Sequence, residues 1–453
     1  MGKKYFGTDG IRGEANRELT VDIALRLGYA LGYYLKTTKN TDEKIKVIMG
    51  CDTRISGYML RSALTAGLNS MGIYVDFVGV IPTPAVAYIT RAKNAAAGIM
   101  ISASHNPAKD NGLKLFNSDG YKFSDDIEDL IESYMDKVDE ITASPVAGDK
   151  VGKFKYAEDD YFLYRDYLIK TVKGNFKGIK IVLDTANGSA YRAAKDVFLE
   201  LGAELVVIND APNGRNINVR CGSTHPEILS KVVIGYEADL GLAYDGDADR
   251  LIAVDRFGNI IDGDKIIAIL SLELKKKNLL KNNKVVTTVM SNMGFEKFLN
   301  SNGIELLRAN VGDRHVLEKM LAENIVIGGE QSGHIILSDY ATTGDGVLSS
   351  LKLVEALRDL GKNLDELVRE IKDWPQSLIN VRVDNRKKDS FNKNEKISKF
   401  IVDIEEKYKG SVRVLVRKSG TEPLIRVMTE GEEENLVKRL AEEIADVVEK
   451  ELS

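Results

Sequence analysis

The residues best suited to chemistry begin in a polar loop that directly follows an apolar run. Residues 96–101 predict a buried strand, and Ser102-Ala-Ser-His-Asn-Pro107 follows it. Pro107 fixes its own φ and disfavours helix at Asn106, so the chain must turn there. Ser104 is therefore expected on a rigid loop at a strand's end, where parallel α/β sheets bind ligands. A serine placed there can be a nucleophile or carry a covalent phosphate, although a purely structural turn has the same composition.

A second candidate is a run of three aspartates that follows the apolar residues 240–243. Asp245, Asp247 and Asp249 alternate along the chain, so their carboxylates lie on one side of an extended segment and repel one another. A divalent cation relieves that repulsion, and hard oxygen ligands favour Mg²⁺. An EF-hand is excluded, because arginines occupy the positions of its glycine and its final glutamate. A solvated acidic turn is the alternative. A magnesium ion with few protein ligands would take phosphate oxygens, which points back to Ser104.

A basic loop near the end of the chain predicts a phosphate site. Its candidate residues are Arg417, Ser419, Gly420, Thr421 and Arg426. Glycine allows close backbone approach, the hydroxyls donate hydrogen bonds, and two guanidinium groups can bind a dianion. Basic loops are also common on protein surfaces, so the composition alone does not distinguish a binding site from ordinary surface.

Further polar residues could bind or protonate a sugar. Glu330 and Ser332, in Gly328-Gly-Glu-Gln-Ser-Gly-His334, could hydrogen-bond sugar hydroxyls or only form a turn. Arg12, Lys114 and His334 could each transfer a proton at a reacting hydroxyl, and spacing does not choose among them. Four other polar residues are expected only to brace the loops: Asp52, Arg54, Asp184 and Asn187.

Composition limits the function classes. The chain has 453 residues and predicts three or four domains. Two cysteines offer no disulfide framework or zinc cluster, and a net charge of −5 gives no reason to expect nucleic acid or an anionic membrane as partner. No apolar run approaches the roughly 18 residues that cross a bilayer, and no hydrophobic signal region opens the chain. A cytoplasmic protein is therefore expected.

Apolar strands alternate with helical patterns over most of the chain, which predicts α/β architecture. Strands are predicted at 45–50, 74–78, 96–101, 112–116, 179–183, 205–208, 240–243, 285–289, 306–308 and 325–327. Helices are predicted at 21–35, 59–71, 125–138, 226–236, 265–275, 294–301 and 316–323, with a loop at 81–84. The tail predicts a strand at 378–383, a hairpin at 412–428 and helices at 394–407 and 433–451.

The predicted organisation is three consecutive α/β domains with mixed sheets and a smaller C-terminal α+β domain. The expected ranges are 1–153, 154–256, 257–373 and 374–453. Each domain contributes one of the polar loops. Trp374-Pro375 ends the third domain, since proline stops the preceding helix.

Together the loops resemble the four signature loops of the α-D-phosphohexomutase family. They are Ser102-Ala-Ser-His-Asn-Pro107, Asp245-Gly-Asp-Ala-Asp-Arg250, Gly329-Glu-Gln-Ser-Gly-His334 and Arg417-Lys-Ser-Gly-Thr-Glu-Pro423. They occur in the family's order and at its spacing, and the resemblance extends over essentially the whole chain. The opening Tyr5-Phe-Gly-Thr-Asp-Gly-Ile-Arg-Gly13 and Gln331 are similar to the aminosugar branch of the family. The resemblance implies four domains in a heart shape around a central cleft.

The resemblance also implies roles for the candidate residues. By position, Ser104 and not Ser102 is the phosphoserine. Mg²⁺ would be bound by Asp245, Asp247, Asp249 and the Ser104 phosphate. Sugar contacts would come from Glu330, Ser332 and Arg250, and proton transfer from Arg12, Lys114 or His334. The non-reacting phosphate would be bound by Arg417, Ser419, Gly420, Thr421 and Arg426.

The implied activity is a phosphoserine-dependent mutase for glucosamine phosphates. It would interconvert the 6-phosphate and the 1-phosphate through a sugar 1,6-bisphosphate, which also serves as activator. The bisphosphate must reorient between the two transfers, which implies a mobile tail domain with a hinge near residues 373–376. A phosphomannomutase or phosphoglucomutase with the same mechanism is one alternative. A non-catalytic phosphosugar-binding regulator and a phosphatase are others. The expected partner is a small phosphosugar, and a homodimer is consistent with the family.

Overall fold

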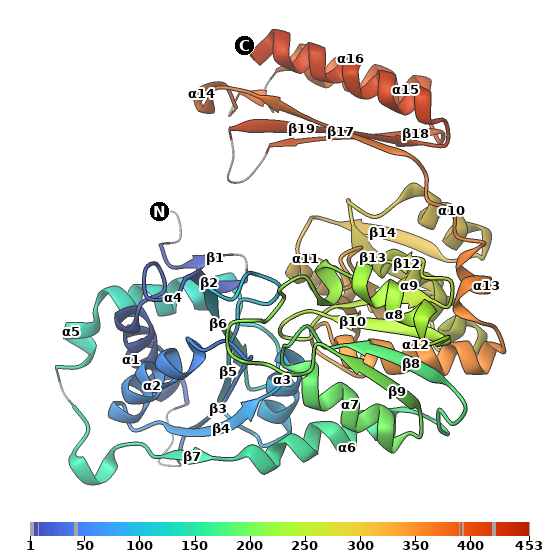
Figure 1. Cartoon of the computed structure of the whole chain (residues 1–453). Helices are drawn as coiled ribbons and strands as arrows, with labels where there is room; N and C mark the ends of the chain where they lie inside the picture. Colours follow the sequence, from blue (N-terminus) through green and yellow to red (C-terminus); the bar gives the residue numbers. More distant parts are fainter. Residues whose placement is uncertain are drawn as a thin grey trace. The chain divides into compact units, whose positions relative to one another are not determined.

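The computed structural model describes residues 4–7, 9–39, 44–143, 145–388, 390–391, 394–418 and 423–452. The chain divides into two compact units, and each is described here by itself. Unit 1 comprises Met1–Met290 and Glu305–Val368, and unit 2 comprises Ser291–Ile304 and Arg369–Ser453. Unit 1 contains three mixed sheets with helices, and unit 2 contains one antiparallel sheet with helices (Figure 1).

The first sheet of unit 1 has the strand order β1-β2-β6-β5-β3-β4-β7. Its strands are β1 (Phe6–Gly7), β2 (Gly10–Glu14), β3 (Lys46–Cys51), β4 (Tyr74–Val80), β5 (Ala97–Ile101), β6 (Asp110–Asn117) and β7 (Phe154–Tyr156). Pairing is parallel from β5 through β3 and β4 to β7, and antiparallel from β5 through β6 and β2 to β1. The helices are α1 (Val21–Lys39), α2 (Gly57–Ser70), α3 (Thr83–Ala92), α4 (Asp125–Asp136) and α5 (Val138–Ile141).

The second sheet has the order β12-β11-β10-β8-β9 and places a buried strand before the acidic loop. Its strands are β8 (Lys180–Asp184), β9 (Glu204–Ile208), β10 (Leu240–Tyr244), β11 (Leu251–Asp255) and β12 (Ile260–Ile261). Every residue of β10 is buried, so the loop after it begins inside the protein. The helices of this region are α6 (Tyr161–Thr171), α7 (Ala190–Glu200) and α8 (Glu227–Gly235).

The third sheet has the order β14-β13-β15-β16, with only the β15–β16 pair antiparallel. Its strands are β13 (Lys284–Thr288), β14 (Glu305–Ala309), β15 (Ile327–Gly329) and β16 (Ile335–Leu337). The accompanying helices are α9 (Gly263–Lys276), α11 (Asp313–Glu323), α12 (Gly346–Leu360) and α13 (Leu364–Val368). The predicted plan of three successive mixed sheets is confirmed.

Unit 2 contains the antiparallel sheet β17-β19-β18. Its strands are β17 (Gln376–Arg382), β18 (Val412–Lys418) and β19 (Leu424–Gly431), and its helices are α10 (Met293–Ser301), α14 (Asn385–Lys388), α15 (Glu395–Lys407) and α16 (Glu434–Leu452). Helix α10 is attached through Glu430, whose Oε1 accepts from the Met293 N–H at 2.9 Å. Trp374, in the segment predicted as a hinge, exchanges two hydrogen bonds with Asn292 inside unit 2. The division from unit 1 falls earlier, after Val368.

Three findings refine the sequence analysis. The loop predicted at 81–84 is wrong in part, because Thr83 and Pro84 begin helix α3. Proline is tolerated in the first turn of a helix, where its missing N–H needs no partner. Strand β7 pairs with β4, so the first sheet continues beyond residue 153, and the boundary there stays a prediction. Among the described residues, no helix is long and apolar enough to cross a membrane.

Candidate functional site

The loop after β5 places Ser104 in an unusual backbone conformation. Ser104 is buried and has a φ of 53°, in the left-handed region that non-glycine residues seldom adopt. Its carbonyl accepts hydrogen bonds from Arg54 Nη2 at 3.0 Å and Asn218 Nδ2 at 2.8 Å, and its N–H donates to Ser102 Oγ at 2.9 Å. These three bonds stabilise a conformation that would otherwise cost about 1–3 kcal/mol.

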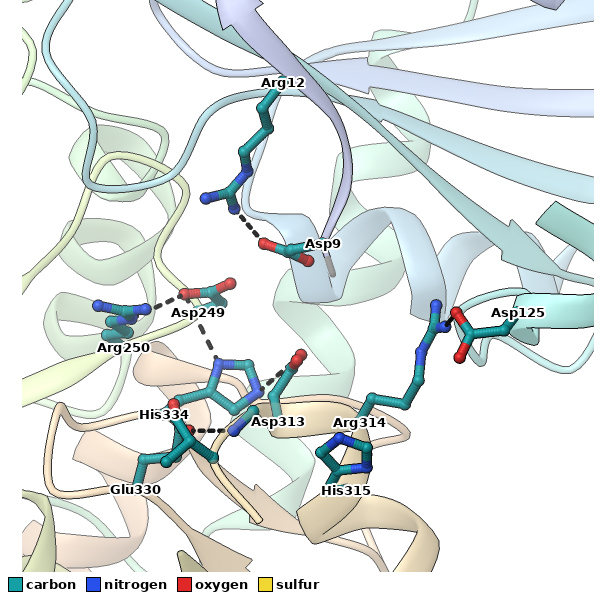
Figure 2. Close-up of a pocket in the computed structure, with 12 residues that line it drawn as sticks. Asp9, Arg12, Asp125, Asp249, Arg250, Asp313, Arg314, His315, Glu330 and His334 are labelled. Atoms are coloured by element: carbon teal, nitrogen blue, oxygen red, sulfur yellow. Dashed lines mark hydrogen bonds and ion pairs between the residues drawn. The ribbon is translucent and has the colours of Figure 1, made fainter. Parts of the chain in front are cut away.

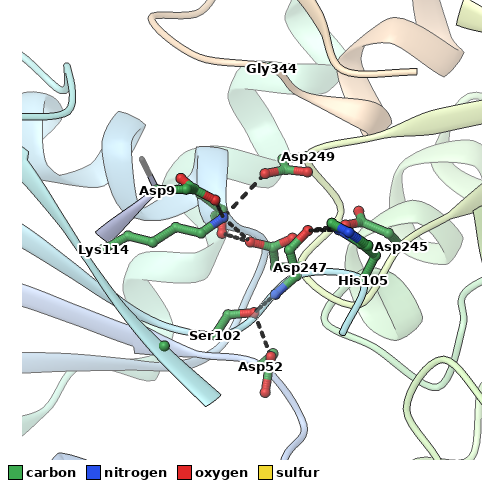
Figure 3. Close-up of polar contacts among 12 residues, drawn as sticks. Asp9, Asp52, Ser102, His105, Lys114, Asp245, Asp247, Asp249 and Gly344 are labelled. Carbon is green, nitrogen blue, oxygen red and sulfur yellow. Dashed lines mark hydrogen bonds and ion pairs between the residues drawn. The ribbon is translucent and has the colours of Figure 1, made fainter. Parts of the chain in front are cut away.

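The two serines of this loop make different contacts. The Ser102 hydroxyl donates to Asp52 Oδ2 at 2.5 Å (Figure 3). Asp52 also pairs with Arg54. Ser102, Asp52 and Arg54 therefore brace the loop, as expected for the last two. The Ser104 hydroxyl instead donates to Asp245 Oδ2 at 2.5 Å. Ser104 is thus the serine whose reactive oxygen faces the acidic loop.

The three aspartates after β10 converge on one buried point. One carboxylate oxygen from each of Asp245, Asp247 and Asp249 lies within 4.8 Å of the others. Asp247 Oδ2 accepts from Thr83 Oγ1 at 2.5 Å and from Lys114 Nζ at 2.7 Å. Among the described residues, its other oxygen, Oδ1, is buried without a hydrogen-bond partner. A buried carboxylate oxygen that accepts no hydrogen bond, beside two more carboxylates, is a suitable ligand for a hard divalent metal ion.

Burial and mutual repulsion set the electrostatics of this acidic loop. Burial raises the pKa of Asp245 well above its usual range, and the charges of Asp249 and Asp247 add to the rise. Burial also acts to raise the pKa of Asp249, but Lys114 and His334 outweigh it and place that pKa well below its usual range. A cation bound between the carboxylates would favour the ionised form of all three.

The structure brings two of the three proton-transfer candidates directly to the aspartates. Lys114 is buried on β6 and lies 3.2 Å from Asp249 Oδ2 as well as 2.7 Å from Asp247 Oδ2 (Figure 3). His334 places Nδ1 3.7 Å from Asp249 Oδ1, while its Nε2 accepts from the Gly344 N–H at 3.1 Å. The backbone bond makes Nδ1 the protonated nitrogen of the neutral ring. The third candidate, Arg12 on β2, pairs with Asp9 instead.

Arg12, Asp249 and His334 border one open cavity with a volume of about 280 Å³, near the lower end of the size range of small-molecule sites (Figure 2). Its lining includes the predicted residues Arg12, Asp249, Arg250, Glu330 and His334. The remaining lining residues are Asp9, Asp125, Val311, Gly312, Asp313, Arg314 and His315. Ser332 lies beside the cavity, with its hydroxyl donating to Glu330 Oε2 at 3.3 Å.

The predicted phosphate site of unit 2 is described only in part. Arg417 on β18 and Arg426 on β19 are directly opposite each other in the register of the two strands. Burial lowers the pKa of Arg417, and the positive charge of the neighbouring Arg426 lowers it further. An anion between them would relieve their repulsion. Ser419, Gly420 and Thr421 lie outside the described residues.

Four charged residues in this region were not singled out from the sequence. Asp9, Asp313 and Arg314 line the cavity, and Lys122 contacts the first two of them from behind the lining. Asp9 lies in the opening glycine-rich stretch, which gave a signal for the region without identifying this carboxylate. Lys122 and Arg314 carry no local signal, because their partners are far away in the sequence.

Models of one protein family match the chain in four successive segments. They describe phosphoglucomutase/phosphomannomutase α/β/α domain I at residues 3–142, domain II at 162–258, domain III at 262–373 and the C-terminal domain at 378–447. The chain belongs to the phosphoglucomutase/phosphomannomutase family. Four successive domains, three α/β and a smaller last one, are therefore confirmed as its fold.

Members of this phosphohexomutase family match the chain over its full length. The phosphoglucosamine mutase of Fusobacterium nucleatum is 78% identical over 99% of this chain and 100% of its own length. The corresponding enzyme of Clostridioides difficile is 50% identical over 100% of both. Among solved structures, a family protein from Burkholderia thailandensis superposes with a TM-score of 0.82 at 23% identity, covering 98% of this chain and 97% of that one. The N-acetylphosphoglucosamine mutase of Aspergillus fumigatus superposes with a TM-score of 0.66 at 16% identity, covering 99% of this chain and 96% of that one.

Proposed function

We propose that this chain interconverts glucosamine 6-phosphate and glucosamine 1-phosphate through a phosphoserine at Ser104. The observation that carries the proposal is the full-length relative, 78% identical, that is a phosphoglucosamine mutase. The site is consistent with it, since the Ser104 hydroxyl faces three convergent carboxylates beside a sugar-sized cavity. The product would feed UDP-N-acetylglucosamine and cell-wall precursor synthesis.

The metal in this proposal is Mg²⁺. Asp245, Asp247 and Asp249 would bind it together with a phosphate oxygen on Ser104, and it would neutralise charge on the transferring phosphoryl group. Asp247 Oδ1, which accepts no hydrogen bond from the described residues, supports this assignment. The Aspergillus enzyme of similar fold has been crystallised with GlcNAc-6P and magnesium.

The reaction requires two phosphoryl transfers in opposite directions. In the first, the P–O bond at Ser104 Oγ breaks and a P–O bond to the sugar O1 forms, giving the 1,6-bisphosphate. The O1 proton goes to a base of the site, and the serine oxygen regains a proton. The bisphosphate then turns, its 6-phosphoryl group returns to Ser104, and O6 is protonated. Arg12, Lys114 and His334 are the proposed proton carriers.

The remaining groups bind and orient the sugar phosphate. Glu330, Ser332 and Arg250 are proposed to contact the sugar, since Glu330 and Arg250 line the cavity and Ser332 bonds to Glu330. The opposed Arg417 and Arg426 support a phosphate site on the tail domain. Such oriented binding lowers the barrier because the reacting atoms are held in contact.

A turnover assay with Mg²⁺ and a trace of sugar 1,6-bisphosphate tests the proposal. Wild type, Ser104→Ala and Ser102→Ala would be compared on glucosamine, glucose and mannose 6-phosphates. We expect the aminosugar to be preferred, Ser104→Ala to be inactive, and Ser102→Ala to be slower but still phosphorylated. Preference for glucose or mannose would indicate a phosphoglucomutase or phosphomannomutase instead. Released inorganic phosphate would indicate a phosphatase, and no turnover by fully phosphorylated protein would indicate a binding regulator.

A further inference from the structure

A buried lysine joins two walls of the cavity. Lys122 lies just after β6, with a side chain only 12% exposed. Its Nζ contacts Asp9 Oδ1, from the turn between β1 and β2, and Asp313 Oδ2 at 2.5 Å, at the first residue of α11. Asp9 and Asp313 both line the cavity. One cation therefore connects a wall built by the first sheet to a wall built by the third domain.

The next residue, Arg314, supplies a positive charge to carboxylates of the first domain, whereas Asp313 supplies a negative charge to Lys122. Arg314 pairs with Asp125 (Figure 2). It also donates from Nη2 to the Phe123 carbonyl at 3.0 Å and lies 3.2 Å from Glu128 Oε1. The first turn of α11, with the loop that leads into it, thus presents the Asp313 carboxylate to Lys122 and the Arg314 guanidinium to Asp125 and Glu128. A displacement of this loop would separate both sets of opposite charges, so the arrangement specifies one position for it.

The position of this loop affects two groups of the proposed reaction. The Gly312 N–H donates to Glu330 Oε1 at 3.2 Å, so the loop orients a carboxylate proposed to bind the sugar. Asp313 Oδ2 lies 3.7 Å from His334 Nε2, on the opposite side of the imidazole from Asp249 (Figure 2). A shift of the loop would therefore move both Glu330 and His334.

The other carboxylate bound by Lys122 contacts the remaining proton-transfer candidates. Asp9 pairs with Arg12, and its Oδ2 lies 3.5 Å from Lys114 Nζ. Among the described residues, Lys122 is the one cation with contacts to both Asp9 and Asp313. Lys122 is thus connected through Asp9 to Arg12 and Lys114, and through Asp313 to His334.

We propose that Lys122 is a positioning residue for the mutase reaction, which fixes the separation of Asp9 and Asp313 and through them orients Arg12, Lys114 and His334. This inference rests on the proposed function. A displacement of about 1 Å in such groups costs about 10²-fold in rate. Lys122 does not line the cavity and acts only through Asp9 and Asp313, so its loss should lower kcat by a larger factor than it raises the KM for the sugar phosphate.

The test uses full-length, phosphorylated enzyme with Mg²⁺ and four variants. Lys122→Met removes the cation, Lys122→Arg keeps it, and Lys122→Met/Asp313→Asn removes one charge of each sign. Lys109→Met is the control, since Lys109 is 64% exposed and pairs with Glu14 at 3.3 Å on the surface. For each variant, kcat, KM and Tm are measured.

We expect kcat to fall about 10²-fold in Lys122→Met and to recover largely in Lys122→Arg. The double variant should regain the Tm lost when Asp313 is left without its lysine partner, but not the kcat. If it regains both, Lys122 only neutralises charge and the inference is wrong. It is equally wrong if Lys122→Met retains the kcat of Lys109→Met. If Lys122→Met does not fold, the double variant and Lys122→Arg decide the question. An inactive wild type would instead overturn the proposed function.

Discussion

Asp345 should make the free energy of unfolding depend on pH in a direction opposite to that of most carboxylates. It is only 2% exposed and caps helix α12, accepting from the Leu348 N–H at 2.9 Å and from the Tyr164 hydroxyl at 2.9 Å. Burial raises its pKa from 3.8 to about 6, because the hydrogen bonds from Leu348, Tyr164 and the Val347 N–H only partly compensate for lost hydration. The folded state therefore binds this proton more tightly than the unfolded state.

The sign and size of the effect follow from linkage. Stability from this group is fully present below pH 3.8 and is lost as the pH rises through about 6. The complete loss amounts to about 3 kcal/mol, and the part lost between pH 5 and pH 7.5 is about 1.4 kcal/mol. Asp345→Asn carries a permanently neutral cap whose oxygen can still accept from Leu348. It should be more stable than wild type at pH 7.5 and lack this part of the pH dependence.

The assay compares urea unfolding of wild type and Asp345→Asn at pH 5 and pH 7.5, followed by far-UV circular dichroism. Fluorescence is less suitable, because the single tryptophan, Trp374, belongs to unit 2 while Asp345 belongs to unit 1. The change in the free energy of unfolding between pH 5 and pH 7.5 is obtained for each protein, and the variant's change is subtracted from that of the wild type. The contributions of the other titrating groups are the same in both proteins and cancel in this subtraction. Equal pH dependence in both proteins, or a variant less stable than wild type at pH 7.5, would refute the reasoning.

Two further predictions concern the serine and metal loops. Asn218→Ala removes donors to the Ser104 and Asn106 carbonyls, at 2.8 and 3.1 Å, so the serine loop should loosen. We expect a loss of about 1–3 kcal/mol in stability and a lower kcat, and an unchanged kcat would argue against this support. Asp247→Asn should raise the Mg²⁺ concentration for half-maximal turnover at least about 10-fold, because a charged ligand is lost. Titration of activity with Mg²⁺ measures it, and an unchanged midpoint would contradict the assigned ligand.

Local sequence patterns predicted the reactive loops because the residues with suitable chemistry lie close together in the sequence of each loop. Ser104 and the aspartates follow apolar runs that became the buried strands β5 and β10, so their place at the strand ends was predictable. Their roles stay a prediction. Helix α3 was not predicted, since the two prolines at its start suggest a turn until the packing of the following apolar residues is known.

The contacts of Lys122 illustrate what the sequence does not contain. Lys122 and Asp313 are 191 positions apart, and neither has a neighbour in the sequence that distinguishes it from a surface residue. Their pairing depends on how the first and third domains pack. The same holds for the Ser104 hydroxyl and Asp245, 141 positions apart, although there the nature of each loop suggested the partner.

The attachment of helix α10 to the tail bears on how this protein can be divided. The backbone crosses between the two units after Met290, after Ile304 and after Val368, so unit 2 is assembled from two separate stretches of chain. A fragment ending near residue 373 would retain α10 but lose Glu430, the acceptor of its first N–H, together with the strands around it. The tail is therefore not a detachable appendage. Shuffling of this last domain between relatives would have to exchange residues 291–304 along with it.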